Sequence, residues 1–308
     1  MKTLRQREQI TAYGFLALQL IGLVVFILGP LVASFYYTFV HWDLISSPEW
    51  VGLKNWKYLV GDPRIRKVLG NTLRFILFGT TSYLTLSLFM AVLLNNSRRA
   101  TGLFRTIFFL PWILSPIAVG ITWTWMLNTR SGPVSQLFNL LGVHSPEFLL
   151  DANYAMPAIA LVTTWQGLGY GMTLYLAGLQ SIPDILYDAA KVDGANGWQQ
   201  FRHVTFPLLS PTILFLTVTS FIGAFQLYDI VVVMTGGITY TPPGGPEDST
   251  RTIVLYLYNQ MFEYSERISG LGYAATIAWM LAILIFIVTA IQWRFSKKWV
   301  FCMGEEQR

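Results

Sequence analysis

The chain has 308 residues, of which 54% are hydrophobic and only 12% are charged. A soluble domain usually carries about 25% charged residues, so this chain has too few to cover a water-facing surface, and lipid is its expected solvent. The formal net charge is +5, but the cations stand in short clusters beside apolar runs, which argues against a continuous nucleic-acid-binding surface.

Six apolar stretches are long enough to span about 30 Å of hydrocarbon, which takes roughly 20 helical residues. The predicted spans are Tyr13–Tyr36, Asn71–Leu94, Leu103–Leu127, Ala155–Gly178, Ser210–Val233 and Leu271–Trp293. The first run is too long for a signal peptide and lacks a small-residue cleavage site, so we expect an uncleaved helix. The sequence therefore predicts an all-α, polytopic membrane protein with an N-terminal segment 1–12, a transmembrane domain 13–293 and a tail 294–308.

The distribution of Lys and Arg between the loops predicts the orientation of these spans. With the N-terminus inside, the loops on that side hold most of the basic residues, among them Arg98 and Lys297. The first loop on the other side is an exception, because it has a basic cluster within residues 54–67. Since basic loops favour the cytoplasmic side, we predict a multi-pass protein of the cell (inner or plasma) membrane with both termini in the cytoplasm.

The cytoplasmic loop between the fourth and fifth predicted spans, residues 181–211, has the pattern of a folded element. Pro183 suits a first helical position, and apolar residues at helical spacing follow it as far as Ala190. Asp193-Gly194 then ends the helix, because glycine can adopt the left-handed backbone conformation. The sequence predicts a short helix with one apolar face.

A second short helix is predicted directly after this break. Asn196 can cap a helix Gly197–Thr205, and Pro207 and Pro211 are expected to bend the chain back into the membrane. Small residues around the turn would let another protein approach the backbone closely. We therefore interpret the two helices as a docking surface on the cytoplasmic face.

The same loop carries a resemblance to a known family. The residues are Asp188-Ala189-Ala190, Asp193-Gly194-Ala195 and then Phe201, Val204, Pro207 and Pro211. Their order and spacing resemble the EAA motif of ABC importer permeases, in which Glu-Ala-Ala precedes Asp-Gly-Ala and, later, an aliphatic residue and a proline. Asp188 departs from the usual glutamate, which keeps the charge but shortens its reach.

Further short motifs are similar to the carbohydrate branch of that family and together cover about residues 70 to 280. They are Asn71-Thr72, Phe109-Leu110-Pro111, Phe225, Tyr228-Asp229, Thr235-Gly236-Gly237, Tyr256-Leu257-Tyr258, Phe262 and Gly272-Tyr273-Ala274-Ala275. Gly244-Gly245-Pro246 comes later than the family pattern places it, so an insertion is expected to enlarge the external loop 236–250.

The resemblance implies the type I ABC importer permease fold and the import of a sugar by alternating access. It also implies that helix Pro183–Val192 docks into a groove on a cytoplasmic dimer of ATPase subunits, whose ATP-driven closure rocks the spans. The residues implied in this coupling are Asp188, Ala189, Ala190, Asp193, Gly194, Ala195, Phe201 and Pro207. A second, homologous permease and an extracytoplasmic solute-binding protein are the other implied partners, beside membrane lipid.

The chain itself has no features of an enzyme. It contains no Gly-Lys dipeptide and hence no phosphate-binding loop, so ATP and Mg would belong to the partner ATPase and no cofactor to this chain. His41, His144 and His203 stand far apart, and Cys302 is the only cysteine, so no metal site is expected. No catalytic triad or carboxylate pair is evident at membrane depth.

Polar residues within apolar spans are costly and therefore indicate candidate substrate contacts. Aromatic faces stack on sugar rings, and amides and carboxylates bind sugar hydroxyls. The candidates chosen for this chemistry are Trp165, Gln166, Tyr170, Tyr175, Gln226 and Asp229. Each could instead serve helix packing, and Asp229 could be an external cap or ion-pair partner.

The main alternative is an ion-coupled secondary transporter. Such a protein is expected to show buried carboxylates or interrupted helices at the membrane midplane, and the docking surface would have no purpose in it. Within the importer interpretation, the sequence leaves maltose-like oligosaccharides, other disaccharides and glycerol phosphate open as substrates.

Overall fold

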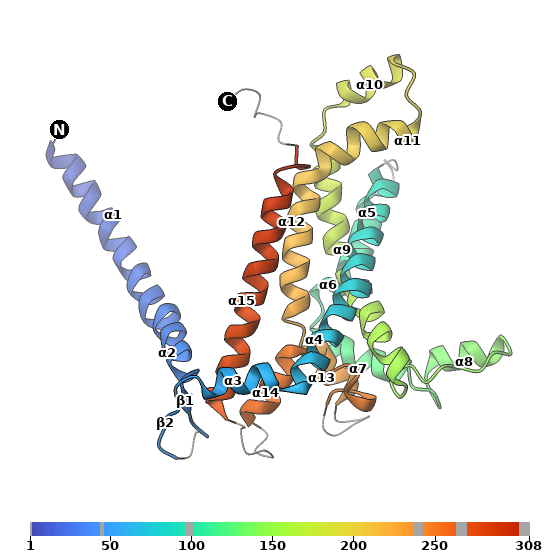
Figure 1. The fold of residues 1–308 in the computed structure, drawn as a ribbon. Helices are drawn as coiled ribbons and strands as arrows, with labels where there is room; N and C mark the ends of the chain where they lie inside the picture. Colours follow the sequence, from blue (N-terminus) through green and yellow to red (C-terminus); the bar gives the residue numbers. More distant parts are fainter. Residues whose placement is uncertain (1, 44–45, 96–100, 237–242, 263–269, 302–308) are drawn as a thin grey trace. The chain divides into compact units, whose positions relative to one another are not determined.

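The computed structural model of the chain describes residues 2–43, 46–95, 101–236, 243–262 and 270–301 (Figure 1). Arg98, Gly237 and Cys302 lie outside these ranges, as does part of the predicted loop insertion. The described chain is helical almost throughout, and its contacts divide it into two compact units. The first contains Met1–Pro63 and Leu257–Met280, and the second contains Arg64–Tyr256 and Leu281–Arg308.

The first unit begins with a long helix that includes the first predicted span. Its elements are α1 (Lys2–Leu23), the π-helical turn η1 (Val24–Leu28), α2 (Gly29–Tyr37), β1 (Val40–His41), β2 (Glu49–Trp50) and α3 (Lys54–Gly61). The strands β1 and β2 pair antiparallel, with Val40 opposite Trp50 and His41 opposite Glu49. The side chain of buried Asn55 donates to the carbonyl oxygens of Thr38 and Val40, at 3.0 Å each, and so ties α3 to the end of α2 and to β1.

The second unit contains most of the helices. Its elements are α4 (Pro63–Phe75), the π-helical turn η2 (Ile76–Thr80), α5 (Thr81–Asn95), α6 (Thr101–Ile113), α7 (Pro116–Met126), α8 (Pro133–Leu140), α9 (Ala152–Gln180), α10 (Asp184–Val192), α11 (Gly197–Gln200), the π-helical turn η3 (Phe201–Thr205), α12 (Phe206–Phe225), α13 (Asp229–Thr235) and the 3₁₀ turn η4 (Pro246–Asp248). Two further helices, α14 (Ile253–Phe262) and α15 (Leu271–Ser296), contribute to both units.

The core of the second unit lies around α9, which packs against α5, α6 and α12. Apolar side chains of α5, α9 and α12 form its buried cluster, in which Met172, Leu176 and Leu216 are fully buried. Glycines on α9 bring the neighbouring helices close. A Cβ on Gly169 would overlap the carbonyl oxygen of Phe108, so α6 can lie this close to α9 only because position 169 has no side chain.

Within the described residues, four helical stretches are long and apolar enough to cross a membrane. They are Thr11–Tyr37, Pro63–Asn95, Gly197–Phe225 and Leu271–Ser296, and the bent pair Gly102–Ile113 and Pro116–Met126 would make a fifth. The predicted fourth span lies inside α9, a 29-residue helix that is not among them. The all-α, polytopic class is confirmed, and the six-span count is compatible with these helices.

The third predicted span, Leu103–Leu127, is not one straight helix. α6 ends at Ile113 and α7 begins at Pro116, and the two helices meet at 96°. The backbone of Ser115 is extended, with φ −57° and ψ 132°, because the ring of the following proline disfavours a helical conformation there. The prediction of an unbroken span was therefore wrong at this point.

The fifth predicted span, Ser210–Val233, is wrong at both ends. A continuous helix runs from Gly197 to Phe225, so the two prolines do not interrupt it, although its path bends between α11 and α12 (Figure 1). The π-helical turn η3 precedes Pro207, and a wider turn accommodates a residue that cannot donate a helical hydrogen bond. The helix then ends at Gln226, and α13 is a separate short helix.

Candidate functional site

A cavity lies among the helices of the second unit, near the middle of α9. Its volume is about 360 Å³. It is lined by Phe75, Gly79, Thr80, Tyr83, Trp112, Thr163, Thr164, Gly167, Tyr170, Thr219, Ser220, Gly223, Ala224 and Leu227. These residues come from the helix Pro63–Asn95, from α6, α9 and α12, and from the chain just after α12. None of these described lining residues is charged, so the cavity offers rings, hydroxyl groups and glycine backbone.

Two aromatic rings form one wall of this cavity. The rings of Trp112 and Tyr170 are stacked, with centroids 4.6 Å apart and an interplanar angle of 16°. Only Tyr170 of this pair was predicted as a substrate contact. Trp112 and the other lining tyrosine, Tyr83, were missed, although an aromatic residue beside Pro111 in an apolar span is a signal that could have identified Trp112.

The other predicted residues of α9 lie outside this cavity. Trp165 is 41% exposed, has an edge-to-face contact with Trp123, and lines a separate apolar hollow of about 820 Å³ between α5, α6 and α9. Tyr175 is 1% exposed and belongs to the apolar core. The structure therefore places these two rings outside the cavity that Tyr170 lines.

Gln166 has a hydrogen bond that follows from the bend between α6 and α7. Its side-chain Nε2 donates to the carbonyl oxygen of Leu114 at 3.1 Å. Leu114 lies in the break between the two helices, where carbonyl groups lose their helical partners. The buried amide of Gln166 thus stabilises the bent path of the third predicted span.

Gln226 and Asp229 lie at the break between α12 and α13. Gln226 follows the last residue of α12, Asp229 is the first residue of α13, and both are exposed. Leu227, which stands between them, lines the cavity, and its carbonyl accepts a hydrogen bond of 2.8 Å from Thr252 Oγ1. Of the six predicted substrate contacts, only Tyr170 lines the cavity. Gln226 and Asp229 do not line it, but they stand on either side of the lining residue Leu227 in the sequence.

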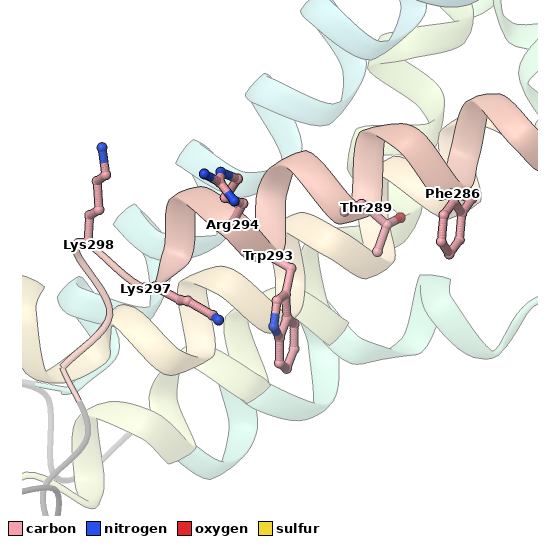
Figure 2. Close-up of a pocket in the computed structure, with 7 residues that line it drawn as sticks. Phe286, Thr289, Trp293, Arg294, Lys297 and Lys298 are labelled. Carbon is pink, nitrogen blue, oxygen red and sulfur yellow. The ribbon is translucent and has the colours of Figure 1, made fainter. Parts of the chain in front are cut away.

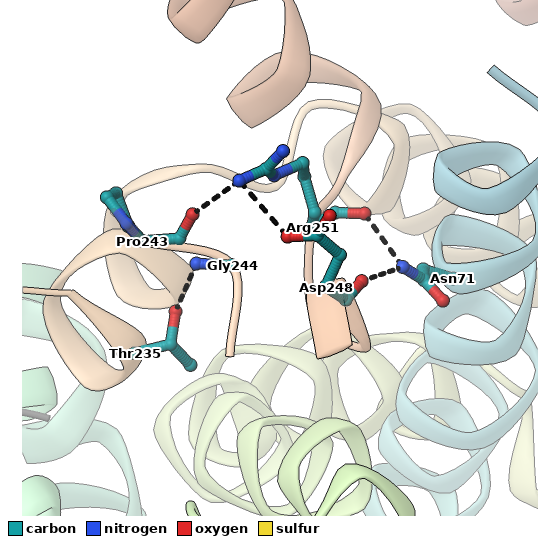
Figure 3. Close-up of polar contacts among 6 residues, drawn as sticks. All are labelled: Asn71, Thr235, Pro243, Gly244, Asp248 and Arg251. Carbon is teal, nitrogen blue, oxygen red and sulfur yellow. Dashed lines mark hydrogen bonds and ion pairs between the residues drawn. The ribbon is translucent and has the colours of Figure 1, made fainter. Parts of the chain in front are cut away.

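A polar network connects the segment 243–251 to α4 and α13 (Figure 3). Asn71 on α4 donates through Nδ2 to the carbonyl oxygens of Asp248 and Arg251, at 2.7 and 3.1 Å. Arg251 forms an ion pair of 3.1 Å with Asp248, and Thr235 Oγ1 on α13 accepts a hydrogen bond from the backbone N–H of Gly244. We refer to these contacts as the Asn71 network.

The loop with the EAA-like pattern forms two helices, α10 and α11, joined by a turn. α10 starts one residue later than predicted, because Pro183 is its N-cap, and ends at Val192. Gly194 has φ +79° and terminates the helix in the left-handed conformation that the sequence analysis expected. We call residues 183–205 the coupling hairpin.

Half of the predicted coupling residues are exposed, and all of them except Pro207 lie on the coupling hairpin. None of the α10 residues is buried, and the apolar side chains of Ile185 and Val192 are 73% and 87% exposed. Asp188 forms a surface ion pair of 3.0 Å with Lys191. The predicted positions divide as follows: Ala189, Asp193 and Gly194 are exposed, and Ala190, Ala195, Phe201 and Pro207 are half-buried.

Hydrogen bonds hold the hairpin in a fixed shape. The side chain of Asn196 accepts from the Gln199 N–H while the Gln199 side chain accepts from the Asn196 N–H, which is a complete capping box. The hydroxyls of Tyr187 and Thr205 are 3.0 Å apart and link α10 to η3. Because η3 continues directly into α12, the hairpin is joined to this helix without a loop.

Comparisons with known proteins agree with this architecture. Residues 83–300 match the family described as "Binding-protein-dependent transport system inner membrane component". The chain is 32% identical over 305 residues to the "Probable ABC transporter permease protein YesP" of Bacillus subtilis (strain 168), covering 98% of this chain and 95% of that protein. It is 33% identical over 299 residues to the "Lactose transport system permease protein LacF" of Rhizobium radiobacter, covering 96% and 97%.

Further similarities concern a phosphate-ester transporter and a solved structure. The "sn-glycerol-3-phosphate transport system permease protein UgpA" of Agrobacterium fabrum is 31% identical over 293 residues, with 94% of this chain and 96% of that protein covered. A crystal structure of a bacterial ABC transporter that imports the acidic polysaccharide alginate aligns with a TM-score of 0.79 and 20% identity, covering 97% of this chain and 99% of that chain. This structural likeness supports the fold.

Proposed function

Because this chain belongs to the family of binding-protein-dependent transport system inner membrane components, we propose that it forms one half of the translocation path of an ATP-driven importer for a neutral carbohydrate. The family is one of transport components and not of enzymes. The observation that carries the proposal is the uncharged cavity of rings and hydroxyl groups, whose walls continue into the coupling hairpin.

The chemistry of the cavity favours a neutral sugar. The stacked rings of Trp112 and Tyr170 offer an apolar surface to a sugar ring. The hydroxyls of Thr163 and Ser220 donate to carbonyl oxygens of their own helices, so their oxygens can accept from sugar hydroxyls. A phosphate or carboxylate would be buried among these residues without a cation, which is costly. The cavity therefore fits a sugar such as the one in the name of the lactose relative better than glycerol phosphate.

The helices offer a physical route from ATP hydrolysis to this cavity. α9 contributes Gly167 and Tyr170 to the lining and ends four residues before α10 begins. On the other side of the hairpin, one helix runs from Gly197 to Phe225 and contributes Ser220, which lies about 35 Å along the helix from Gly197. In the proposed mechanism, a displacement of the hairpin tilts both cavity walls and alternates access to the two sides.

This mechanism needs partners that supply energy and substrate. The proposed partner of the exposed α10 face is a dimer of ATPase subunits that bind ATP and Mg, and Asp188, Gly194 and the neighbouring small residues are the proposed contacts. The family description supports dependence on a solute-binding protein. A second permease would complete the path, and both termini would lie in the cytoplasm on the hairpin side.

The experiment that tests the coupling role compares two glycine substitutions. Gly194→Asp places a charged side chain at φ +79° on the hairpin, while Gly142→Asp imposes the same strain at φ +72° in the turn after α8. Neither position has another atom within 4 Å of an added Cβ. Vesicles with the partner subunits are assayed for ATP-dependent uptake of neutral disaccharides, oligosaccharides and glycerol phosphate.

We expect wild type and Gly142→Asp to take up a neutral sugar, and Gly194→Asp to lose uptake and to copurify without the ATPase. Uptake that is driven by a proton gradient without ATP would instead support the ion-coupled secondary transporter. Uptake of glycerol phosphate alone would contradict the assignment of a neutral substrate while leaving the coupling role intact.

A further inference from the structure

The C-terminal part of α15 has a hollow that lies apart from the cavity and the hairpin. Its volume is about 750 Å³. It is lined by Phe286, Thr289, Ala290, Trp293, Arg294, Lys297 and Lys298 (Figure 2). The positions from Phe286 to Arg294 recur at intervals of three and four residues and form one stripe along α15, and Lys297 and Lys298 follow directly after the helix ends at Ser296.

The lining of the hollow has an apolar part and a basic part. Phe286 and Trp293 are 74% and 64% exposed, and Figure 2 shows them on one side of α15 with Thr289 between them. The basic part consists of Arg294 on the last turn of α15 and of Lys297 and Lys298 just after the helix, and all three are exposed. Within the described part of the chain, no ion pair involves any of these three cations.

We propose that this hollow is a binding site for an anionic phospholipid. The phosphate would lie among Arg294, Lys297 and Lys298, and the first acyl segment would follow the surface of Ala290 and Phe286. Trp293 stands at the boundary between the two parts, where an amphipathic ring is stabilised at the headgroup level. The positive charge of the site matches an anionic headgroup. The apolar residues beside it would contact an acyl chain, a contact that a free anion could not make. The proposal does not depend on which solute the protein transports.

A contact at the end of α15 assigns the lipid to one leaflet. The backbone N–H of Phe301 donates to Ser210 Oγ at 2.9 Å, so the chain after α15 is fixed beside the start of α12. The coupling hairpin leads into α12 at the same end. The lipid therefore belongs to the leaflet on the hairpin side, where anionic lipids attract basic residues.

The test measures the retention of phosphatidylglycerol, compared with phosphatidylcholine of the same acyl chains, on the purified full-length chain by native mass spectrometry. The triple variant R294Q/K297Q/K298Q removes the basic part of the site. The control K54Q/K57Q/K67Q removes the same number of exposed cations from α3 and α4. A basic residue near an anionic lipid surface changes binding by roughly fivefold, so the triple variant should bind phosphatidylglycerol about 100-fold more weakly.

A second variant distinguishes a lipid site of defined shape from non-specific electrostatic binding of anionic lipids. Ala290→Phe fills the hollow at an exposed position and leaves every charge in place, and we expect it to lose phosphatidylglycerol while its melting temperature stays at the wild-type value. Equal retention by wild type and either variant would overturn the proposal. So would equal retention of the two lipids, or full displacement by soluble glycerol phosphate, which would indicate an anion site without a lipid.

Discussion

Trp112 is the residue at which the proposed sugar site can be tested most directly, because its ring stacks on Tyr170 and lines the cavity. Trp112→Ala removes an aromatic contact worth about 0.5–1.5 kcal/mol beyond its buried area, so the KM for uptake should rise about tenfold. Trp112→Phe should retain most of the affinity. Trp125→Ala, at an exposed ring on α7 outside the cavity, should leave KM unchanged. An unchanged KM in Trp112→Ala would place the sugar elsewhere.

Gly169 allows a prediction about stability that does not involve the substrate. A Cβ at this position would overlap the carbonyl oxygen of Phe108, which belongs to the backbone and cannot rotate away. Gly169→Ala should therefore separate α6 from α9 and destabilise the protein by about 1–3 kcal/mol. Gly70→Ala, in α4 with no atom near an added Cβ, should instead be neutral or stabilise by up to about 1 kcal/mol. Thermal unfolding in detergent measures the difference, and equal melting temperatures would contradict the close approach of the two helices.

At the scale of elements, the Asn71 network fixes the segment after α13 to α4. The Asn71 side chain is 3% exposed and donates to two carbonyl oxygens. Asn71→Ala removes the donor from the Arg251 carbonyl oxygen and leaves that of Asp248 only the Arg251 N–H at 3.3 Å, which should cost about 1–3 kcal/mol. Asn71→Asp should cost more, because a buried carboxylate would then face both carbonyl oxygens. Asn139→Asp, on the exposed side of α8, serves as the control. Thermal unfolding would rank the stabilities of the three variants. A melting temperature of Asn71→Asp equal to that of wild type would argue against the network.

The elements also show what the sequence could predict. Local rules were sufficient where local chemistry decides the structure: Gly194 ends α10, and Asn196 caps α11. They failed where a residue's role depends on a distant partner. Gln166 resembled a sugar ligand because amides are rare in apolar spans, yet its amide bonds the Leu114 carbonyl 52 positions away. Pro116 was visible in the sequence and could have indicated the bend at which the Leu114 carbonyl loses its helical partner.

The same distinction explains the errors in the fifth span and in the substrate residues. Pro207 and Pro211 were expected to bend the chain between two separate helices, but one helix continues through both prolines, with a π-helical turn just before Pro207. α12 ends at Phe225 with Gln226 as its C-cap, and Tyr228 then has a φ of −141°, which is not helical; no local pattern marked this position. Tyr170 could be selected from its span, whereas its partner Trp112 depends on how α6 packs on α9.

At the scale of the whole molecule, the proposed mechanism requires the coupling hairpin to lie in the cytoplasm. Phe301 is hydrogen-bonded beside the start of α12, and Cys302 follows it directly, so the single cysteine of the chain is a natural reporter for the hairpin side. We expect a membrane-impermeant maleimide to label Cys302 only after the cells are permeabilised.

The matched control uses Cys302→Ser with a new cysteine, Asn139→Cys, on α8. In Figure 1, α8 stands at the opposite end of the second unit from α10 and α11. Asn139 is exposed, so Asn139→Cys should react in intact cells. The reverse labelling of both cysteines would put the hairpin outside, where no ATP-driven partner could act on α10. It would also move the lipid site at α15 to the outer leaflet, because Phe301 and Ser210 hold that end of the helix on the hairpin side.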